Sequence, residues 1–139
     1  MAPSFVYIRD NLRIAIEMLN ITELAMQRAE NRNMEAKKAV MAHNYALNIA
    51  KDNLSKATAV VKALQEKIAI PENGFNNRID DATHIADAAY EAACKAREAF
   101  TTSVQEAVDA DKAYRAACKA YETACKACKD LEVVAAEAA

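Results

Sequence analysis

Three cysteines near the end of the chain come nearest, by residue type and spacing, to a chemical site. Cys125 and Cys128 are separated by two residues, and Cys118 lies seven residues before Cys125. On a helix, such spacings place thiols on adjacent turns. Thiolates bind zinc, but a structural zinc site takes four ligands. We therefore expect no metal site, and these three cysteines are the only candidate ligands should the chain bind a metal.

The pair Cys125-x-x-Cys128 also invites comparison with redox and haem-attachment motifs. A thioredoxin-like Cys-x-x-Cys lies in a βαβ setting, and covalent haem attachment uses a His directly after the second cysteine. This sequence shows no strand pattern, and Lys129 occupies the position of that His. We expect no cofactor, although a haem carrier using the three cysteines is kept as an alternative.

A Tyr-x-x-x-Cys pair occurs three times, as Tyr90–Cys94, Tyr114–Cys118 and Tyr121–Cys125. The last two copies are seven residues apart, so on a helix they share one face. The first copy is offset by 24 residues, so its cysteine should point elsewhere. The pattern is typical of two closely packed helices, whose contact positions hold small side chains and an occasional aromatic ring. Cysteine suits such positions because a buried free Cys behaves as a small hydrophobic residue.

Neither histidine completes a recognised site. A di-iron bundle needs two Glu-x-x-His motifs and two further Glu residues, whereas this chain offers only Asp81-x-x-His84, and His43 stands alone. Because the chain contains one glycine, it has neither a glycine-rich phosphate loop nor a nucleophile elbow. We expect a protein that is not an enzyme.

The stretch Pro71-Glu72-Asn73-Gly74-Phe75 determines how these residues are positioned. It holds the only glycine and one of the two prolines, the residues that most strongly interrupt regular structure. We therefore predict an all-α fold, a single helical domain over 1–139 with a helix at about 4–69, a turn at 70–76 and a helix at about 77–137. Asn76 or Asn77 would cap the second helix.

Apolar residues recur every seven positions along both predicted helices. Position a is occupied in the first by Phe5, Leu12, Leu19, Met26, Asn33, Val40, Leu47, Leu54, Val61 and Ile68. Position d of the first helix, from Ile8 onward, is mostly Ala. In the second helix, position a begins at Ile79 and includes Phe100, Tyr114 and Tyr121, and position d begins at Ala82 and is mostly Ala. This pattern predicts a coiled-coil-like antiparallel helical hairpin with an alanine-rich seam.

Two polar segments offer an alternative to continuous helices. Asn33 enters the seam within Glu30–Asn33, and Ser103-x-x-Glu106 has the form of a capping box. Breaks at both would give a monomeric up-down four-helix bundle with helices near 4–30, 34–69, 77–101 and 104–137. We prefer continuity, because a single polar a residue more often fixes register than ends a helix.

Composition and charge limit the possible partners. Alanine accounts for 33 residues, and the net charge is −2. Lysine and arginine never cluster beyond Lys37-Lys38, which argues against a nucleic-acid surface. No apolar run approaches the length of a membrane span. The first residues lack the pattern of a secretory signal, so we expect a cytoplasmic protein, with secretion after removal of a signal as the alternative.

The apolar surface exceeds what one seam needs, so we expect the chain to associate with itself, two hairpins pairing into a four-helix bundle as a homodimer or higher assembly. The predicted function is structural or scaffolding. The residues expected to carry self-association are Phe5, Ile8, Leu12, Leu19, Met26, Val40, Leu47, Leu54, Val61, Phe100, Tyr114 and Tyr121. An alternative is an amphipathic module that binds a lipid or polymer-granule surface.

Overall fold

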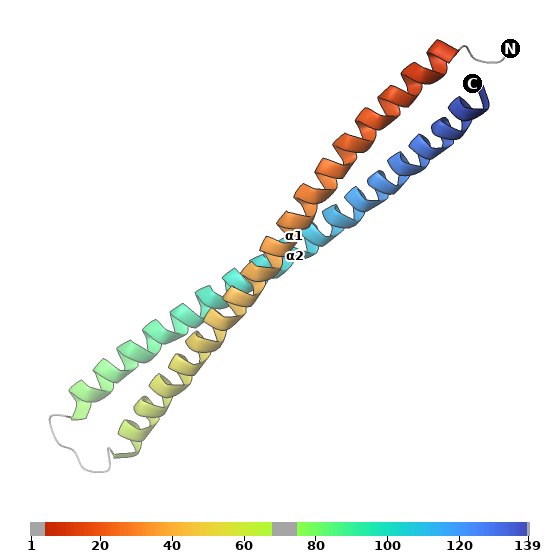
Figure 1. Cartoon of the computed structure of the whole chain (residues 1–139). Helices are drawn as coiled ribbons and strands as arrows, with labels where there is room; N and C mark the ends of the chain where they lie inside the picture. Colours follow the sequence, from red (N-terminus) through yellow and green to blue (C-terminus); the bar gives the residue numbers. More distant parts are fainter. Residues whose placement is uncertain (1–4, 68–74, 139) are drawn as a thin grey trace. The chain divides into compact units, whose positions relative to one another are not determined.

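The computed structural model describes residues 5–67 and 75–138, and it contains two long helices that pack against each other (Figure 1). Helix α1 spans Phe5–Glu66 and helix α2 spans Phe75–Ala138. The all-α prediction is confirmed, and the arrangement is hairpin-like. Most of the predicted turn, residues 70–74, lies outside the described residues. Asn76 and Asn77 lie inside α2, so the prediction that one of them caps this helix is wrong.

Composition explains the length of both helices. The described residues contain neither Gly nor Pro, and Ala, Leu, Met, Lys, Arg and Glu, the strongest helix formers, supply most of them. In proteins, tertiary packing of an apolar face supplies most of the stability of a helix. The packing of α1 against α2 is therefore what needs to be explained.

The chain forms two compact units. Unit 1 combines Met1–Ala36 with Ala107–Ala139, and unit 2 is Lys37–Glu106. In unit 1 the first half of α1 lies beside the second half of α2 (red to orange and blue in Figure 1); in unit 2 the second half of α1 lies beside the first half of α2.

Pairs of residues in unit 1 show the direction of packing. Asn33 contacts Asp111, Glu30 acts on Tyr114, and Glu23 acts on Tyr121. Each step back along α1, first of three residues and then of seven, is matched by an equal step forward along α2. The two helices are therefore antiparallel in this unit and keep one constant register.

The burial pattern follows the predicted heptads. Every a and d residue whose side chain is described is buried or half-buried, whereas nearly all other positions are exposed. The most buried apolar residues are Ile8, Ala110 and Cys128 in unit 1, and Leu47, Ala82 and Ala93 in unit 2. The residues predicted to join chains, Phe5 excepted because its side chain is not described, thus line the seam between α1 and α2 of one chain. Their role in joining two chains stays a prediction.

Both helices continue through their polar seam residues. Asn33 is 6% exposed and Ser103 is 3% exposed, yet α1 and α2 run unbroken past them. The Ser103 hydroxyl donates to the Phe100 carbonyl, 2.8 Å away in its own helix, and the Asn33 amide donates to the Asp111 carboxylate across the seam. Because each finds a partner without unwinding the backbone, the alternative of four shorter helices is wrong.

Candidate functional surfaces

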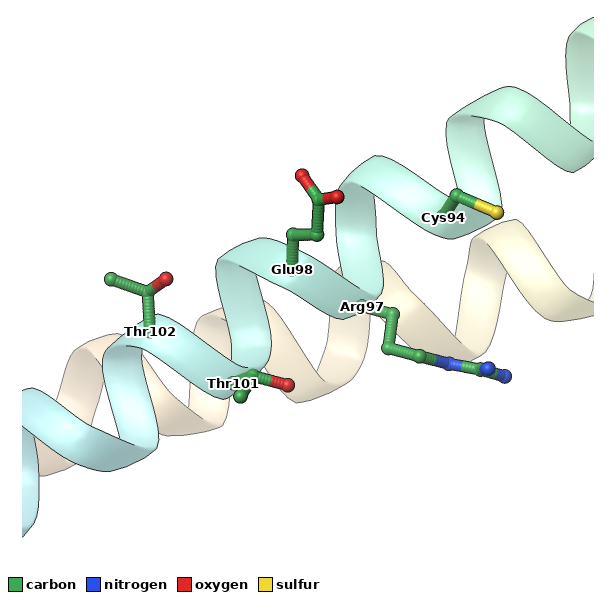
Figure 2. Close-up of a pocket in the computed structure, with 5 residues that line it drawn as sticks. All are labelled: Cys94, Arg97, Glu98, Thr101 and Thr102. Carbon is green, nitrogen blue, oxygen red and sulfur yellow. The ribbon is translucent and has the colours of Figure 1, made fainter.

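A shallow hollow of about 530 Å³ in unit 2 is the first candidate for a small-molecule site. Its lining residues are Cys94, Arg97, Glu98, Thr101 and Thr102. All five are exposed, and all belong to α2. In Figure 2 the side chains of Arg97 and Glu98 extend to opposite sides of the helix. A binding pocket needs convergent polar groups within enclosing walls, and this outer helix face provides neither.

The structure separates the four cysteines by their exposure. Cys94 is exposed, Cys118 and Cys125 are half-buried, and Cys128 is buried in the seam. Across residues 5–67 and 75–138, no group of three or more His, Cys, Asp and Glu side chains is arranged to hold a metal ion. The candidate ligands Cys118, Cys125 and Cys128 therefore do not form a preorganised metal site.

The second Tyr-Cys pair forms a small polar cluster in unit 1. Tyr114 lies at position a of α2, and its hydroxyl hydrogen-bonds to Cys118 one turn later. This hydrogen bond raises the pKa of Tyr114 above its ordinary value, as do the negative charge of the Cys118 thiolate, that of Glu30 on α1, and partial burial. The Tyr114 ring therefore lies at the half-buried seam, and its hydroxyl lies at the edge of the seam beside Cys118.

The third pair repeats the same cluster one heptad further along α2. A hydrogen bond to Cys125 raises the pKa of Tyr121, with further contributions from the charge of that thiolate, from Glu23 and from burial. The first pair differs, because Tyr90 is 61% exposed and Cys94 is exposed. The prediction that the 24-residue offset turns Cys94 elsewhere is confirmed. Glu23 and Glu30 were not predicted, although their seven-residue spacing matches that of the two tyrosines.

The raised pKa values predict a late phase in the alkaline titration. Tyr114 and Tyr121 should ionise above the ordinary tyrosine pKa of about 10. Because the unfolded chain then ionises first, the free energy of unfolding should fall as pH rises past about 10. The measurement is tyrosinate absorbance against pH.

Two double variants provide the comparison for this titration. Y114F/Y121F should lose the late phase, whereas Y45F/Y90F, which removes two exposed tyrosines, should keep it. Equal midpoints in wild type and Y114F/Y121F would contradict the prediction.

The two clusters also define the two sides of the seam. Glu23 and Glu30 lie at position e of α1, and Cys118 and Cys125 lie at position e of α2. The e positions of both helices therefore share one flank of unit 1, and the g positions share the opposite flank. The b positions adjoin the e flank and the c positions adjoin the g flank. In unit 2 the a and d positions are again the buried or half-buried ones, so the flanks are named there by the same heptad positions.

The g and c positions carry exposed apolar side chains, which we call the apolar flank, together with charged and polar ones. In unit 1 it consists of Tyr7, Ile14, Met18 and Ile21 on α1 and of Ala113, Ala116, Ala120, Thr123, Ala127 and Val134 on α2. In unit 2 it consists of Ala42, Ala46, Ile49, Val60 and Ala63 on α1 and of Ile85, Ala88 and Ala92 on α2. Polar side chains interrupt it in unit 1 at Asn11, Arg28, Arg32, Glu35, Asp109, Asp130 and Glu137. They interrupt it in unit 2 at Asn53, Lys56, Asp81, Lys95, Thr102 and Glu106.

The opposite, polar flank has a different character. Its e and b positions carry many charged, amide and thiol side chains. They also carry exposed apolar residues, which are Val6, Ile16, Met34 and Val108 in unit 1 and Met41, Tyr90 and Val104 in unit 2. On the apolar flank, Thr123 is counted as apolar. Its hydroxyl donates to the Lys119 carbonyl of its own helix at 3.0 Å, so its methyl group is the part left exposed to solvent. The two flanks thus differ mainly in the many alanines at the g and c positions and the larger number of charged and amide side chains at the e and b positions.

The histidines and the helix hydropathy do not indicate a functional site. His43 lies half-buried at a d position, and its Nδ1 has no hydrogen-bond partner among the described residues; His84 and Asp81 are exposed. Within the described residues, neither helix offers a stretch long and apolar enough to span a bilayer. Comparison with protein-family models and with curated proteins finds no match for the chain. The apolar flank is therefore the candidate functional surface.

Proposed function

We propose that this chain is a non-enzymatic structural protein that acts by self-association, two hairpins pairing into a coiled-coil-like four-helix bundle. The observation that carries the proposal is the apolar flank, which in unit 1 exposes Tyr7, Ile14, Met18 and Ile21 by 51–61%. Water contact at such a face is unfavourable by about 25 cal/mol per Å² of apolar area. A second helix pair that covers this face removes that cost.

The total surface of the chain supports this proposal. The accessible area is 10368 Å² for 15.2 kDa, whereas a compact monomer of this mass exposes about 7,100 Å². The excess is larger than the roughly 800 Å² per partner that a standard stable interface buries. No described side chain is less than 2% exposed, so one hairpin has only a thin core. Pairing would supply the missing core.

Light-scattering mass measured across an eluting peak tests the proposal. Wild type should elute as a dimer or a higher assembly at micromolar concentration. I14E/I21E, which places two charges on the apolar flank, should elute as a folded monomer, because both isoleucines are already more than half exposed within one chain.

A matched control distinguishes the effect of two added charges from the effect of their position on the apolar flank. N20E/Q27E adds the same two charges at the same seven-residue spacing, at exposed b positions on the polar flank. This variant should associate as wild type does. A wild-type monomer would overturn the proposal. If that monomer floated with lipid vesicles, the apolar flank would instead be a lipid-binding surface.

A further inference from the structure

We infer that α2 makes a second contact between copies of this chain, through the face that it turns away from the seam. In this contact an acidic stretch of α2 in one copy lies against a basic stretch of α2 in another. The proposed pairing uses the apolar flank, whereas this contact uses the f and b positions of α2 and joins paired hairpins into larger assemblies. The complementary charges of the two stretches are the observation that supports it.

The acidic stretch lies in unit 2, over residues 80–98 of α2. These residues contain five acidic and two basic side chains, a net charge of −3. The two basic residues, Lys95 and Arg97, lie at c and e positions. At the f and b positions every charged side chain is acidic and exposed, and these are Asp80, Asp87, Glu91 and Glu98.

The basic stretch lies in unit 1, over residues 112–129 of α2. These residues contain five basic and one acidic side chain, a net charge of +4. The f positions of α1 are not divided in this way, because Asp10 and Glu17 in unit 1 and Asp52 in unit 2 are all acidic. All six charged side chains of the basic stretch are exposed at f and b positions, and these are Lys112, Arg115, Lys119, Glu122, Lys126 and Lys129.

Each stretch places like charges on adjacent turns of α2. In the acidic stretch Asp87 and Glu91 are four residues apart. In the basic stretch Lys112, Arg115 and Lys119 lie on successive turns. Like charges at this spacing destabilise a helix, whereas a helix face that meets only water commonly alternates the sign of its charges. The helix dipole does not explain the division, because its effect is confined to the first and last turns.

Few of these charges are neutralised within the chain. Arg115 Nε lies 3.0 Å from Asp111 Oδ2 in the same helix. Among the described residues, the lysines of the basic stretch and the four f and b carboxylates of the acidic stretch form no ion pair. The f positions lie opposite the a and d positions, so they face away from α1. A partner of opposite charge from outside the chain would therefore offset the repulsion within each stretch.

A second copy of this chain supplies both partners. Glu91 and Glu98 are successive f residues of the acidic stretch, seven residues or about 10 Å apart along the helix. Lys112 and Lys119 of the basic stretch have the same spacing, so both glutamates of one copy can meet both lysines of another. An exposed ion pair contributes little by itself. Paired hairpins present two copies of each stretch, and such linked contacts strengthen one another.

The first test is the dependence of light-scattering mass on salt at micromolar concentration. Wild type should have the mass of the dimer at about 1 M salt, where the Debye length is about 3 Å. At about 0.01 M salt, where the Debye length is about 30 Å, its mass should be at least about twice as large.

This titration distinguishes the two contacts. A dimer mass that does not change with salt would overturn this inference and leave self-association through the apolar flank intact. A monomer at high salt that becomes a dimer at low salt would overturn the pairing through the apolar flank and keep this inference. A monomer at every salt concentration would overturn both.

Charge reversal tests which stretches meet. E91K/E98K makes the acidic stretch basic, and K112E/K119E makes the basic stretch acidic. Each variant should stay at dimer mass at low salt, because like charges would then face each other. D10K/E17K is the control, because it makes the same change in net charge as E91K/E98K at two f positions of α1, also seven residues apart. Its mass should rise at low salt as that of wild type does.

The variant that carries all four reversals gives the decisive result. E91K/E98K/K112E/K119E exchanges the signs of the two stretches and keeps the wild-type net charge of −2, so it should regain the low-salt mass. Loss of assembly in both double variants without recovery in this variant would overturn the inference, as would an E91K/E98K protein that still assembles. A wild type that does not respond to salt but floats with phosphatidylserine-containing vesicles would also overturn it, and would assign the basic stretch to anionic lipid. Circular dichroism confirms that each variant remains helical.

Discussion

Replacement of Leu47 by Ala is expected to lower the free energy of unfolding by about 2–4 kcal/mol. Leu47 is 5% exposed and is the only large aliphatic side chain among the described residues of unit 2 that are buried and apolar, where the others are Ala82 and Ala93. The cost of such a change depends on how far neighbouring side chains collapse into the space. Because α2 supplies mostly alanine at its seam positions, little side chain is available to refill it.

A nearby exposed residue gives the matched control. Met41 has a similar size and lies six residues earlier in the same helix, but it is 73% exposed and occupies the polar flank. M41A should change the free energy of unfolding by less than about 0.5 kcal/mol. Urea unfolding of both variants at one fixed protein concentration is the measurement. Equal destabilisation by the two substitutions would mean that the heptad seam does not hold unit 2 together.

Much of the fold follows from the sequence because one periodicity governs both helices. The seven-residue repeats from Phe5 and from Ile79 predict which side chains are shielded from solvent. Every a and d side chain that the structure describes is buried or half-buried. The interruption at Pro71–Gly74 predicts where regular helix ends. The helix cap was misplaced because Asn76 and Asn77 are good cap residues, yet nothing in a local pattern decides whether a helix begins one or two residues earlier.

The candidate surface was only partly predictable for a different reason. The stripes of Ile14, Met18 and Ile21 can be recognised in the sequence as surplus apolar residues. Assigning them to one flank requires knowing which sides of two helices face the same way, and this depends on the packing of Glu30 against Tyr114. The periodicity of one helix carries no information on that relation.

The polar contact at Asn33 has consequences for stability that can be measured in both directions. The Asn33 side-chain amide donates to Asp111 Oδ1 at 3.4 Å, and Arg115 Nε holds Asp111 Oδ2 at 3.0 Å. Asn33 Oδ1 is buried without a hydrogen-bond donor among the described residues. An unsatisfied buried polar atom is unfavourable by about 1–3 kcal/mol. A polar residue at an a position can nevertheless fix the register of the helices.

Substitution of Asn33 by Asp should lower the free energy of unfolding by about 2–4 kcal/mol at neutral pH. The new carboxylate would be buried beside Asp111, and both desolvation and like charge raise the pKa of such a group. Because the folded state then binds a proton that the unfolded state has lost, the deficit relative to wild type should be small below pH of about 4 and grow as pH rises. Urea unfolding at several pH values measures this dependence.

Substitution of Asn33 by Leu separates the loss of the amide from the gain of charge. Asn33→Leu removes the unsatisfied oxygen and fills the a position with an apolar side chain, while Asp111 keeps its ion pair with Arg115. This variant should raise the free energy of unfolding by about 1–2 kcal/mol, with no added pH dependence. If Asn33→Leu lowered the free energy of unfolding as much as Asn33→Asp, the hydrogen bond from Asn33 to Asp111 would stabilise the protein by more than the unpaired Asn33 Oδ1 destabilises it. The polar residue would then stabilise unit 1 in addition to fixing its register.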